Sequence, residues 1–532
     1  MKRRDFIKLS STAGVAGVVG SHFDAAANPL YAQQASGFDL HPFIKAHPEA
    51  VFVYLTDVKE KTDQKGTYDA GHKLASEMFV QTSGGAGFPN STKIACKPNW
   101  TCVPQDRNDP GLMGIITDLG FTEGYCNGIK SKGPQQIYLR DCACPVQWEQ
   151  LGFVEMAKRN NFDLTDVVSK DPWEYGEGDI VYKKIDNGVV LKEIPYQGPM
   201  VAPDSFLVNI AKYKTHAYVG ITTAVKNLQG IAARRIHRFC GFGDPFRQLE
   251  EGYHRFFIPN YLDRIAELHK QHVEAGVPRW NERMERSPFN SGLLTEQWAQ
   301  RMCDSYSVIP MMSAGINVVE GIYWREGDFQ HGPHDGKAMD FMVNMSLFGK
   351  DAFRIDVISH WLAGHEPGNF GLFHIGIERG FLDVLDPFDI PVYLWENGSA
   401  RKIELTELKR TPLLTNYIGR KEGEDLYRLC NEPFDYKAWK ETGKIARIEP
   451  SIKVIGTDSN NHIVMDMSVP EKGDVYVDIL NSRGEAVWSM HAPDLEPGSH
   501  QVVWDGFDQP GMYNTYVKGM EWDAENEMVI YT

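Results

Sequence analysis

The sequence has no Cys-x-x-Cys pair, although it contains eight cysteines. Ferredoxin-type clusters and zinc ribbons take their ligands from such pairs, so neither kind of site is supported. After residue 32, no apolar run approaches the roughly 20 residues of a membrane-spanning helix. The chain also lacks an excess of positive charge, since its formal net charge is −16. This balance argues against nucleic acid and anionic membranes as partners.

The chain does have the size and composition of a globular protein with several domains. Its 532 residues are too many for one ordinary hydrophobic core, so we expect two or three domains. Hydrophobic residues make up 42% and charged residues 24%, which is typical of soluble globular proteins.

The first 32 residues predict an export signal. The run Lys2-Arg3-Arg4-Asp5-Phe6-Ile7-Lys8 precedes a weakly apolar, Gly- and Ala-rich stretch over 13–20. This pattern is typical of twin-arginine signals, with cleavage after Ala27 or Ala32, and it predicts the twin-arginine translocase as a partner. A chance arginine pair at a cytosolic start is the alternative. We therefore expect a periplasmic, extracellular or cell-surface protein.

The export route bears on cofactors and on cysteine pairing. Twin-arginine export carries folded proteins, often with a cofactor already bound, so the signal hints at a cofactor without naming one. In an oxidising periplasm some cysteines can pair, and Cys96 with Cys102 is a candidate because the two are close in sequence.

Strands that alternate with helices predict an α/β fold over residues 33–386. Short apolar runs at 92–95, 206–210 and 315–319 are typical of buried strands, and a helix is expected over 357–363. Polar residues follow each strand, which suggests a parallel or mixed sheet with flanking helices. Ligands of such sheets bind outside the carboxyl ends of the strands.

The rest of the chain divides into a charged, helix-prone connecting region over 387–449 and a β-rich segment over 450–532. The β-rich segment contains short runs with partial alternation, at 463–469, 475–480, 486–490 and 501–504. Turn residues separate these runs, and their regular spacing predicts a small all-β sandwich.

A cationic pocket is predicted where the apolar run 206–210 ends. A polar turn is expected there, with the side chains of Lys212, Lys214, Thr215 and His216. Gly220 is expected to open a helix that places Thr222 and Lys226, four residues apart, on one face. Because the amino end of a helix adds positive potential, we expect this pocket to bind a small anionic ligand. A solvated basic loop before an ordinary helix is the alternative.

A polar loop after the strand at 315–319 is a candidate metal site. Its possible ligands are Glu320, Asp328, His331 and His334. Mixed carboxylate and imidazole ligands suit a divalent metal, and the same groups can supply an acid/base pair near neutral pH. A glycine-rich surface loop with solvated charges is the alternative interpretation.

Several motifs resemble those of the bacterial domain of unknown function 362 family. They are Lys97-Pro98-Asn99 at a strand end, Lys214-Thr215-His216, Gly220-Ile221-Thr222 and the run Lys226-Asn227-Leu228-Gln229-Gly230. A closing family motif is matched by Gly349, Asp351 and Asp356, although Ala352 replaces the usual proline and Arg354 replaces a small residue. The resemblance spans about residues 50–380.

This resemblance implies a set of ligand-binding residues and excludes one cofactor. The implied cofactor-binding residues are Lys97, Asn99, Lys214, Thr215, Thr222, Asn227, Asp351 and Asp356. Family members often carry a ferredoxin module and are described as iron–sulfur proteins. Because this chain lacks the cysteines of that module, we expect no iron–sulfur cluster.

Two further resemblances concern the C-terminal segment and the predicted cationic pocket. Residues 495–506, with Leu495-Glu496-Pro497-Gly498, His500 and Trp504-Asp505-Gly506, are similar to the immunoglobulin-like module of flagellar hook-capping proteins. Such modules attach, space or stabilise their neighbours, so an accessory role is implied.

The order His216, Gly220, Lys226 is remotely similar to lactate racemases, in which a lysine follows a histidine by ten residues. There the lysine anchors a nickel-pincer nucleotide, and histidines ligate metal or move protons. This implies catalytic roles for His216, Lys226 and His237, the last a rough counterpart of a further family histidine. Ala224-Val225 stand where the racemases have two glycines.

Three functions remain open at this point. The first is an exported metal- or cofactor-dependent enzyme that acts on a small anionic substrate, with His216 and Lys226 central. The second is a binding protein that holds the anion without turnover. The third is a cell-surface structural protein that relies on its β-sandwich.

Overall fold

The computed structural model describes most of residues 36–530. The residues in this range that it leaves undescribed are 61, 84, 101–111, 142–144, 168, 217–219, 234–251, 276–291, 327–338, 414–432, 444–449, 459–461, 471, 506–509 and 520–522. None of the described helices is both long and apolar enough to cross a membrane.

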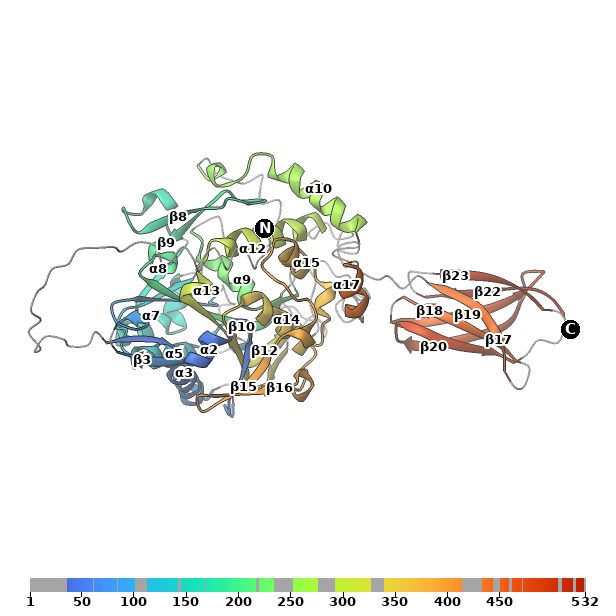
Figure 1. The fold of residues 1–532 in the computed structure, drawn as a ribbon, viewed down its shortest axis with the longest axis horizontal. Coiled ribbons are helices and arrows are strands. Elements are labelled where there is room, and N and C mark those ends of the chain that lie inside the picture. The colour runs from blue at the N-terminus through green and yellow to red at the C-terminus, as the bar shows by residue number, and fades with distance from the viewer. Residues whose placement is uncertain are drawn as a thin grey trace, which may run out of the picture.

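An eleven-stranded mixed sheet forms the centre of the larger part of the molecule (Figure 1). Its main path runs β16-β15-β2-β14-β12-β10-β5-β6-β7, while β11 pairs with β10 and β13 pairs with β12. The strands are β2 (Val51–Leu55), β5 (Lys93–Pro98), β6 (Ile137–Asp141), β7 (Asp163–Asp166), β10 (Ser205–His216), β11 (Gly220–Thr222), β12 (Gly315–Glu326), β13 (Met339–Met342), β14 (Met345–Gly349), β15 (Val392–Glu396) and β16 (Ser399–Ile403).

The strands from β12 to β7 run parallel, and β14 is antiparallel to both of its neighbours. The prediction of an α/β fold with a mixed sheet is therefore confirmed. The parallel strands bring the ends of β5, β6, β10 and β12 to one edge of the sheet, where the predicted motifs lie.

Helices cover both faces of this sheet. They are α2 (Pro42–Ala46), α3 (Gln64–Met78), α4 (Leu112–Ile115), α5 (Leu119–Lys130), α6 (Pro145–Gln150), α7 (Phe153–Asn160), α8 (Gly198–Val201), α9 (Ala224–Leu228), α10 (Tyr261–Glu274), α12 (Gly292–Ser307), α13 (Met311–Ala314), α14 (Ala352–Leu362), α15 (Gly371–Glu378) and α17 (Tyr436–Thr442). Two small sheets accompany them, one of β1 (Gly37–Leu40), β3 (Phe79–Thr82) and β4 (Phe88–Pro89), the other of β8 (Ile180–Lys184) and β9 (Glu193–Gln197).

The alternation of side chains along β10 explains why the sheet has a core on each face. Phe206, Val208 and Ile210 join one buried cluster, which includes side chains of α3 and α5. Leu207 and Ala211 point to the other face and join the cluster of α9 and α14. A strand buried on both faces reads as a continuous apolar run, which is why its first half was recognisable in the sequence.

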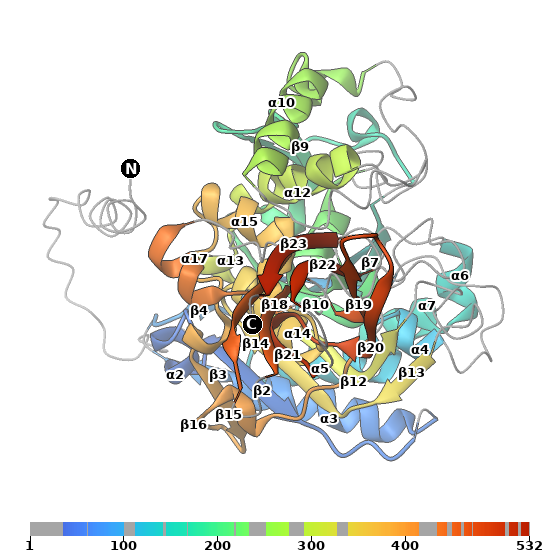
Figure 2. The ribbon, with the colours of Figure 1, turned by 90° about the vertical axis from the view of Figure 1, so that its right-hand side faces the viewer.

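The C-terminal segment forms two antiparallel sheets, as predicted. One has the order β17-β18-β21 and the other β20-β19-β22-β23. Their strands are β17 (Ser451–Thr457), β18 (Ile463–Val469), β19 (Gly473–Asn481), β20 (Ala486–Leu495), β21 (Gly498–Trp504), β22 (Gly511–Lys518) and β23 (Asp523–Ile530). They share a core of their own that includes Met465, Val477 and Trp504. Figure 2 views the molecule with these strands toward the reader.

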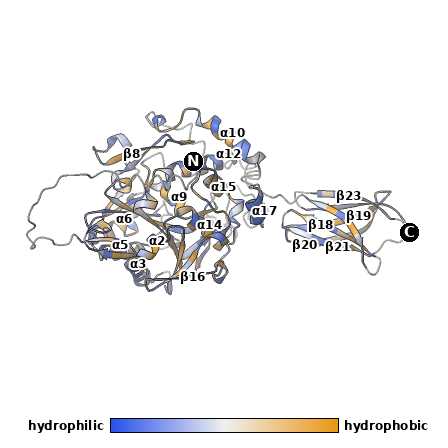
Figure 3. Cartoon of the chain, in the orientation of Figure 1, coloured by the Kyte–Doolittle hydropathy of each residue, from blue (hydrophilic) through white to orange (hydrophobic). Residues whose placement is uncertain are grey.

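The predicted helical connecting region over 387–449 is wrong in part. β15 and β16 lie within it and join the main sheet, where Val392 pairs with Val51. Pairing with β2 outweighs the helix propensity of the charged residues around these strands. The α/β unit therefore extends at least to Ile403. Among the described residues of this region, the mainly hydrophilic α17 is an α-helix as predicted (Figure 3).

Candidate functional site

The predicted polar turn after 206–210 is instead a continuation of β10. The strand runs to His216, and all twelve of its residues are buried. Lys214 pairs with Thr222, and His216 pairs with Gly220, so Gly220–Thr222 is the strand β11 rather than the start of a helix. The helix α9 begins only at Ala224. Thr222 and Lys226 therefore do not share one helix face.

Lys97 and Asn99 form a buried brace with Asn227. Lys97 Nζ lies 2.9 Å from Asp141 Oδ1 and donates to Asn227 Oδ1 at 3.1 Å. Asn99 Nδ2 donates to the same oxygen at 2.8 Å. A Cβ at Gly230 would come within 2.5 Å of Lys97 Cε, which explains the glycine at the end of this motif. These motif residues bind one another and hold the chain after α9 against the sheet.

Two asparagines that the sequence analysis missed extend this brace across the sheet. Asn227 Nδ2 donates to Asn209 Oδ1 at 2.7 Å, and Asn209 Nδ2 donates to Asn317 Oδ1 at 2.8 Å. Asn317 Nδ2 then donates to the Lys350 carbonyl at 3.0 Å. Asn209 and Asn317 are direct partners in the sheet register. The signal was present in the sequence, since each is one polar residue inside an apolar run.

Glu320, a predicted metal ligand, is occupied by protein contacts. Its Oε2 lies 2.7 Å from Lys212 Nζ, and both side chains are fully buried. Its Oε1 accepts the Ile322 amide at 2.9 Å. Burial raises the pKa of Glu320, and the nearby Lys212 opposes that shift. The other predicted ligands, Asp328, His331 and His334, lie outside the described residues, and the described ones include no group of three His, Cys, Asp or Glu placed to hold a metal.

Asp351 and Asp356, predicted to bind a cofactor, cap helices. Asp351 accepts the Phe353 amide at 3.0 Å and begins α14. Asp356 accepts the amides of Ala224 and Val225 at 2.7 and 3.1 Å, and so fixes the start of α9. Burial raises the pKa of Asp356 to about 7, although these hydrogen bonds oppose the shift. Asp351 thus caps α14, and Asp356 positions α9.

His216 lies within electrostatic range of Lys226, another predicted site residue. The His216 ring lies 5.1 Å from the Trp298 ring, and its side chain is buried. Burial, then Lys226, then Lys214 lower the pKa of His216 well below its usual value. The imidazole is therefore neutral at pH 7 and has one ring nitrogen without a proton.

Lys226 and Thr222 have hydrogen-bonding groups that no described residue engages. Lys226 is half-buried, and within the described parts of the chain no hydrogen bond or ion pair engages its ammonium. Thr222 is fully buried, and its hydroxyl has no hydrogen-bond partner among those same residues. Lys214 differs, since its ammonium donates to the Ile115 carbonyl at 2.6 Å. Thr215 is buried on β10, and His237 lies outside the described residues.

A second neutral histidine approaches β11, and the sequence analysis did not assign it. A Cβ at Gly220 would lie 2.9 Å from His360 Cε1 and 2.4 Å from Phe370 Cε1. His360 is buried, and its Nδ1 has no partner among the described residues. Burial, then His365, lower its pKa well below the usual value. The fold thus brings His216 and His360 to the two strands of one hairpin.

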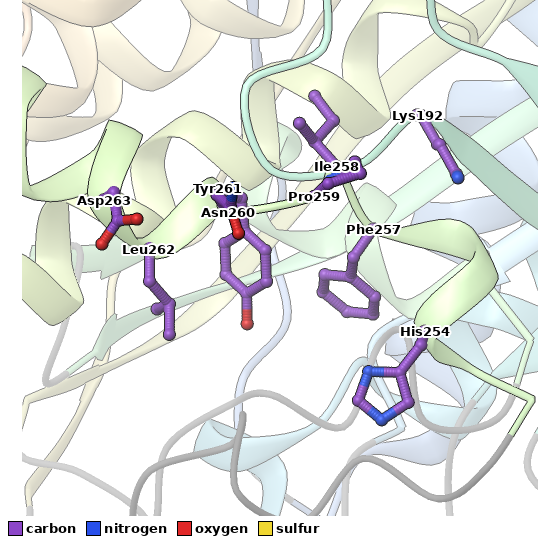
Figure 4. A pocket seen from close by; sticks show the side chains of 9 residues that line it. All are labelled: Lys192, His254, Phe257, Ile258, Pro259, Asn260, Tyr261, Leu262 and Asp263. Atoms are coloured by element: carbon purple, nitrogen blue, oxygen red, sulfur yellow. The ribbon is translucent and has the colours of Figure 1, made fainter.

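A pocket of about 530 Å³ lies at the start of α10 (Figure 4). Its lining residues are Lys192, His254, Phe257, Ile258, Pro259, Asn260, Tyr261, Leu262 and Asp263. None of them was predicted as a site residue. The pocket combines aromatic and aliphatic side chains with Lys192 and His254, which Figure 4 shows at its edge beyond Phe257.

Comparison with known proteins identifies one related family. A family model described as "Domain of unknown function (DUF362)" matches residues 94–360, half of the chain. The match contains the motifs from Lys97 to Asp356, whereas β2, β15 and β16 of the same sheet lie outside it. No curated protein matches the sequence.

Proposed function

Because this chain belongs to the domain of unknown function 362 family, whose description names no activity, we propose its function from the site itself. We propose that the protein binds a small anionic substrate between His216 and Lys226 and acts on it as a metal- or cofactor-dependent enzyme. The observation that carries this proposal is the half-buried Lys226 ammonium, which no described residue engages, beside a neutral imidazole. Lys226 would hold the negative charge, and His216 would accept a proton from the bound ligand.

The residues present also suit a cofactor in part. Lys226 has the side-chain nitrogen that a covalent adduct requires, and His216 is a neutral imidazole of the kind that metals bind. A cofactor held there would supply an electron-accepting group. The chain's own residues would then position the substrate and exclude water, since α9 is fixed by Asp356 and the Asn227 brace.

Anion binding without turnover is the second candidate. It is favoured by the state of the carboxylates, because Glu320, Asp351 and Asp356 all accept hydrogen bonds from the protein. These groups are therefore not free to act as acids or bases on a ligand. In this case Lys226 and His216 alone would define the site.

Isothermal titration with inorganic phosphate and with acetate tests the binding proposal. We expect Lys226→Ala to weaken binding at least tenfold and the double variant Lys226→Ala, His216→Ala to abolish it. Lys93→Ala is a matched control, because Lys93 begins β5 at the opposite edge of the sheet and pairs with Asp204. Unchanged affinity in the double variant would contradict the proposal.

Metal analysis and intact-mass spectrometry distinguish the two candidates. A stoichiometric metal, or an added mass on Lys226, in protein purified from its native compartment would support the enzyme. If both are absent while phosphate or acetate still binds, the cofactor-dependent activity is contradicted and the binding protein remains.

We also propose that the protein is exported to the periplasm or cell surface and that its sandwich is accessory. The support is the twin-arginine pattern at Arg3 and Arg4 and the separate core of the C-terminal strands.

A further inference from the structure

Two thiols meet in the core directly before the Lys97 brace. Cys96 lies on β5 and Cys126 lies on α5, 30 residues later, and their sulfur atoms are 3.8 Å apart. Both side chains are fully buried in the same apolar cluster. Cys102, a candidate partner of Cys96 from the sequence, lies outside the described residues, and the fold places Cys126 beside Cys96.

The geometry allows a covalent bond between them and excludes the third described thiol. A disulfide needs the sulfurs at about 2.05 Å, so they must approach by roughly 1.8 Å. Side-chain rotation supplies movements of this size when two elements are already in contact. Cys303 lies on α12 in the cluster on the other face of the sheet, so the sheet separates it from this pair.

We propose that Cys96 and Cys126 are a modification site, oxidised to a disulfide by a disulfide-bearing oxidant such as oxidised glutathione or a thiol–disulfide oxidoreductase. One protein thiolate attacks the oxidant's disulfide, which forms a mixed disulfide and releases one thiol. The second protein thiolate then displaces the other half of the oxidant. The protein loses two electrons and two protons, and the oxidant leaves as two thiols.

The burial of the pair determines when this reaction occurs. The hydrogen bond from Cys126, and then burial, raise the pKa of the Cys96 thiol well above its usual value. The native state therefore holds little of the reactive thiolate and gives an oxidant no access. The bond therefore forms only when β5 and α5 separate and expose the thiols, by local opening of the folded protein after export or during refolding in an oxidising buffer, and once formed it is shielded from reductants.

Peptide mapping of the refolded full chain tests this site. The protein is unfolded, refolded in a buffer of oxidised and reduced glutathione, alkylated and digested without reduction. Trypsin alone leaves Cys96 and Cys102 in one peptide, so chymotrypsin is added to cut at Trp100. We expect a cross-linked peptide that joins Cys96 to Cys126. A bond from Cys96 to Cys102, or full alkylation of Cys96 and Cys126, would overturn the proposal.

Thermal unfolding gives a second measurement. Protein refolded with the glutathione buffer is expected to melt roughly 5 °C higher than protein refolded with dithiothreitol, because the bond constrains a 30-residue loop. Cys126→Ser should lose this difference, and Cys303→Ser should retain it. If Cys126→Ser does not fold, the peptide map of the unaltered chain still tests whether Cys96 is bonded to Cys126. A difference that persists in a folded Cys126→Ser variant would contradict the assignment.

Discussion

Lys97 carries its charge in one of the most buried positions of the sheet, with about 1% of the residue exposed. Its partner Asp141 is equally buried, and the pair is completed by Asn227. Removal of one member of a buried ion pair leaves the other charge without compensation, which typically costs about 3–5 kcal/mol. The same contact at the protein surface contributes under about 1 kcal/mol.

We therefore predict that Lys97→Ala lowers the free energy of unfolding by about 3–5 kcal/mol, measured by urea denaturation. Lys93→Ala, on the same strand, removes the exposed pair with Asp204 and should cost less than about 1 kcal/mol. Equal effects of the two variants would show that the Lys97 brace does not stabilise the fold as described.

Both the backbone conformation at Gly220 and the side chains around it favour a glycine at this position. Its φ of +73° lies in the left-handed region, and Phe370 and His360 fill the position of a Cβ. Gly380 has nearly the same φ, +74°, but no atom within 4 Å of that position. Alanine substitutions at the two positions therefore distinguish the cost of backbone strain from the cost of overpacking.

Alanine at Gly380 should cost about 1 kcal/mol through backbone strain alone. Gly220→Ala should cost about 2–4 kcal/mol, because the buried rings of Phe370 and His360 must also move. Thermal and urea unfolding of the two variants would measure this difference. A smaller loss for Gly220→Ala than for Gly380→Ala would contradict the described contacts of Gly220 with His360 and Phe370.

At the scale of elements, one histidine joins three helices through two ion pairs. His272 on α10 lies 2.8 Å from Glu296 on α12 and 2.8 Å from Glu378 on α15, one carboxylate at each ring nitrogen. Burial alone would lower the pKa of His272, but the two glutamates outweigh it and raise the pKa to about 9. The charged imidazolium therefore stabilises the packing of α10 at neutral pH.

The sign of the pH dependence follows from this raised pKa. The stabilisation is complete below the unfolded pKa of about 6.5, decreases above it and is lost as the pH rises through about 9. Its size is about 2 kcal/mol, since Glu378 is half exposed and partly screened. The difference in unfolding free energy between the unaltered protein and His272→Gln should be largest at pH 6 and nearly absent at pH 10. His47→Gln, near the exposed Glu49, should show less than about 1 kcal/mol at either pH.

The elements that the sequence predicted well are those whose pattern is local. The strand predicted at 463–469 is observed as β18 with the same bounds, because its side chains alternate between buried and partly exposed. The first half of β10 was recognisable as an apolar run for a similar reason. Family membership and the mixed sheet were also predicted from the sequence.

Charges whose partners lie far along the chain were not predictable in this way. Lys212 and Lys214 resemble a solvated turn in the sequence, yet Lys212 meets Glu320, 108 residues later, inside the core. Asn209 and Asn317 likewise become a site feature only when β10 and β12 pair. The sequence thus marked segments that meet at one edge of the sheet, while the contacts made by their carboxylates and amides depended on the tertiary structure.

At the scale of the whole molecule, the C-terminal sandwich has a separate core and a distinct charge. Residues 450–532 contain fourteen acidic and four basic residues, so this segment carries −10 of the net −16. Its buried cluster contains only its own strands. We predict that a chain ending at residue 449 keeps the melting temperature of the α/β unit within about 2 °C and binds phosphate as the full chain does. Aggregation or loss of binding in the shortened chain would contradict an accessory role.

The export proposal predicts a clear change of location. Arg3→Lys combined with Arg4→Lys should leave the protein in the cytoplasm, because the translocase reads the arginine pair. Cell fractionation and immunoblotting would measure this. Lys2→Gln removes a charge outside the pair and should be exported normally. Export of the double variant at an unchanged level would exclude the twin-arginine route.

The position of β2 in the sheet determines how long the chain must be synthesised before the sheet can close, which bears on the proposed export. β2 pairs with β14 and β15, and the bond between Thr56 and Asn344 joins residues 288 positions apart. At ribosomal rates of about 5–20 residues per second, this strand waits roughly 15–60 s for its neighbours. An N-terminal export signal would be exposed throughout that interval, on a chain whose sheet cannot yet close. A route that carries only folded cargo must therefore delay recognition of the signal, and a shielding chaperone would be its natural means.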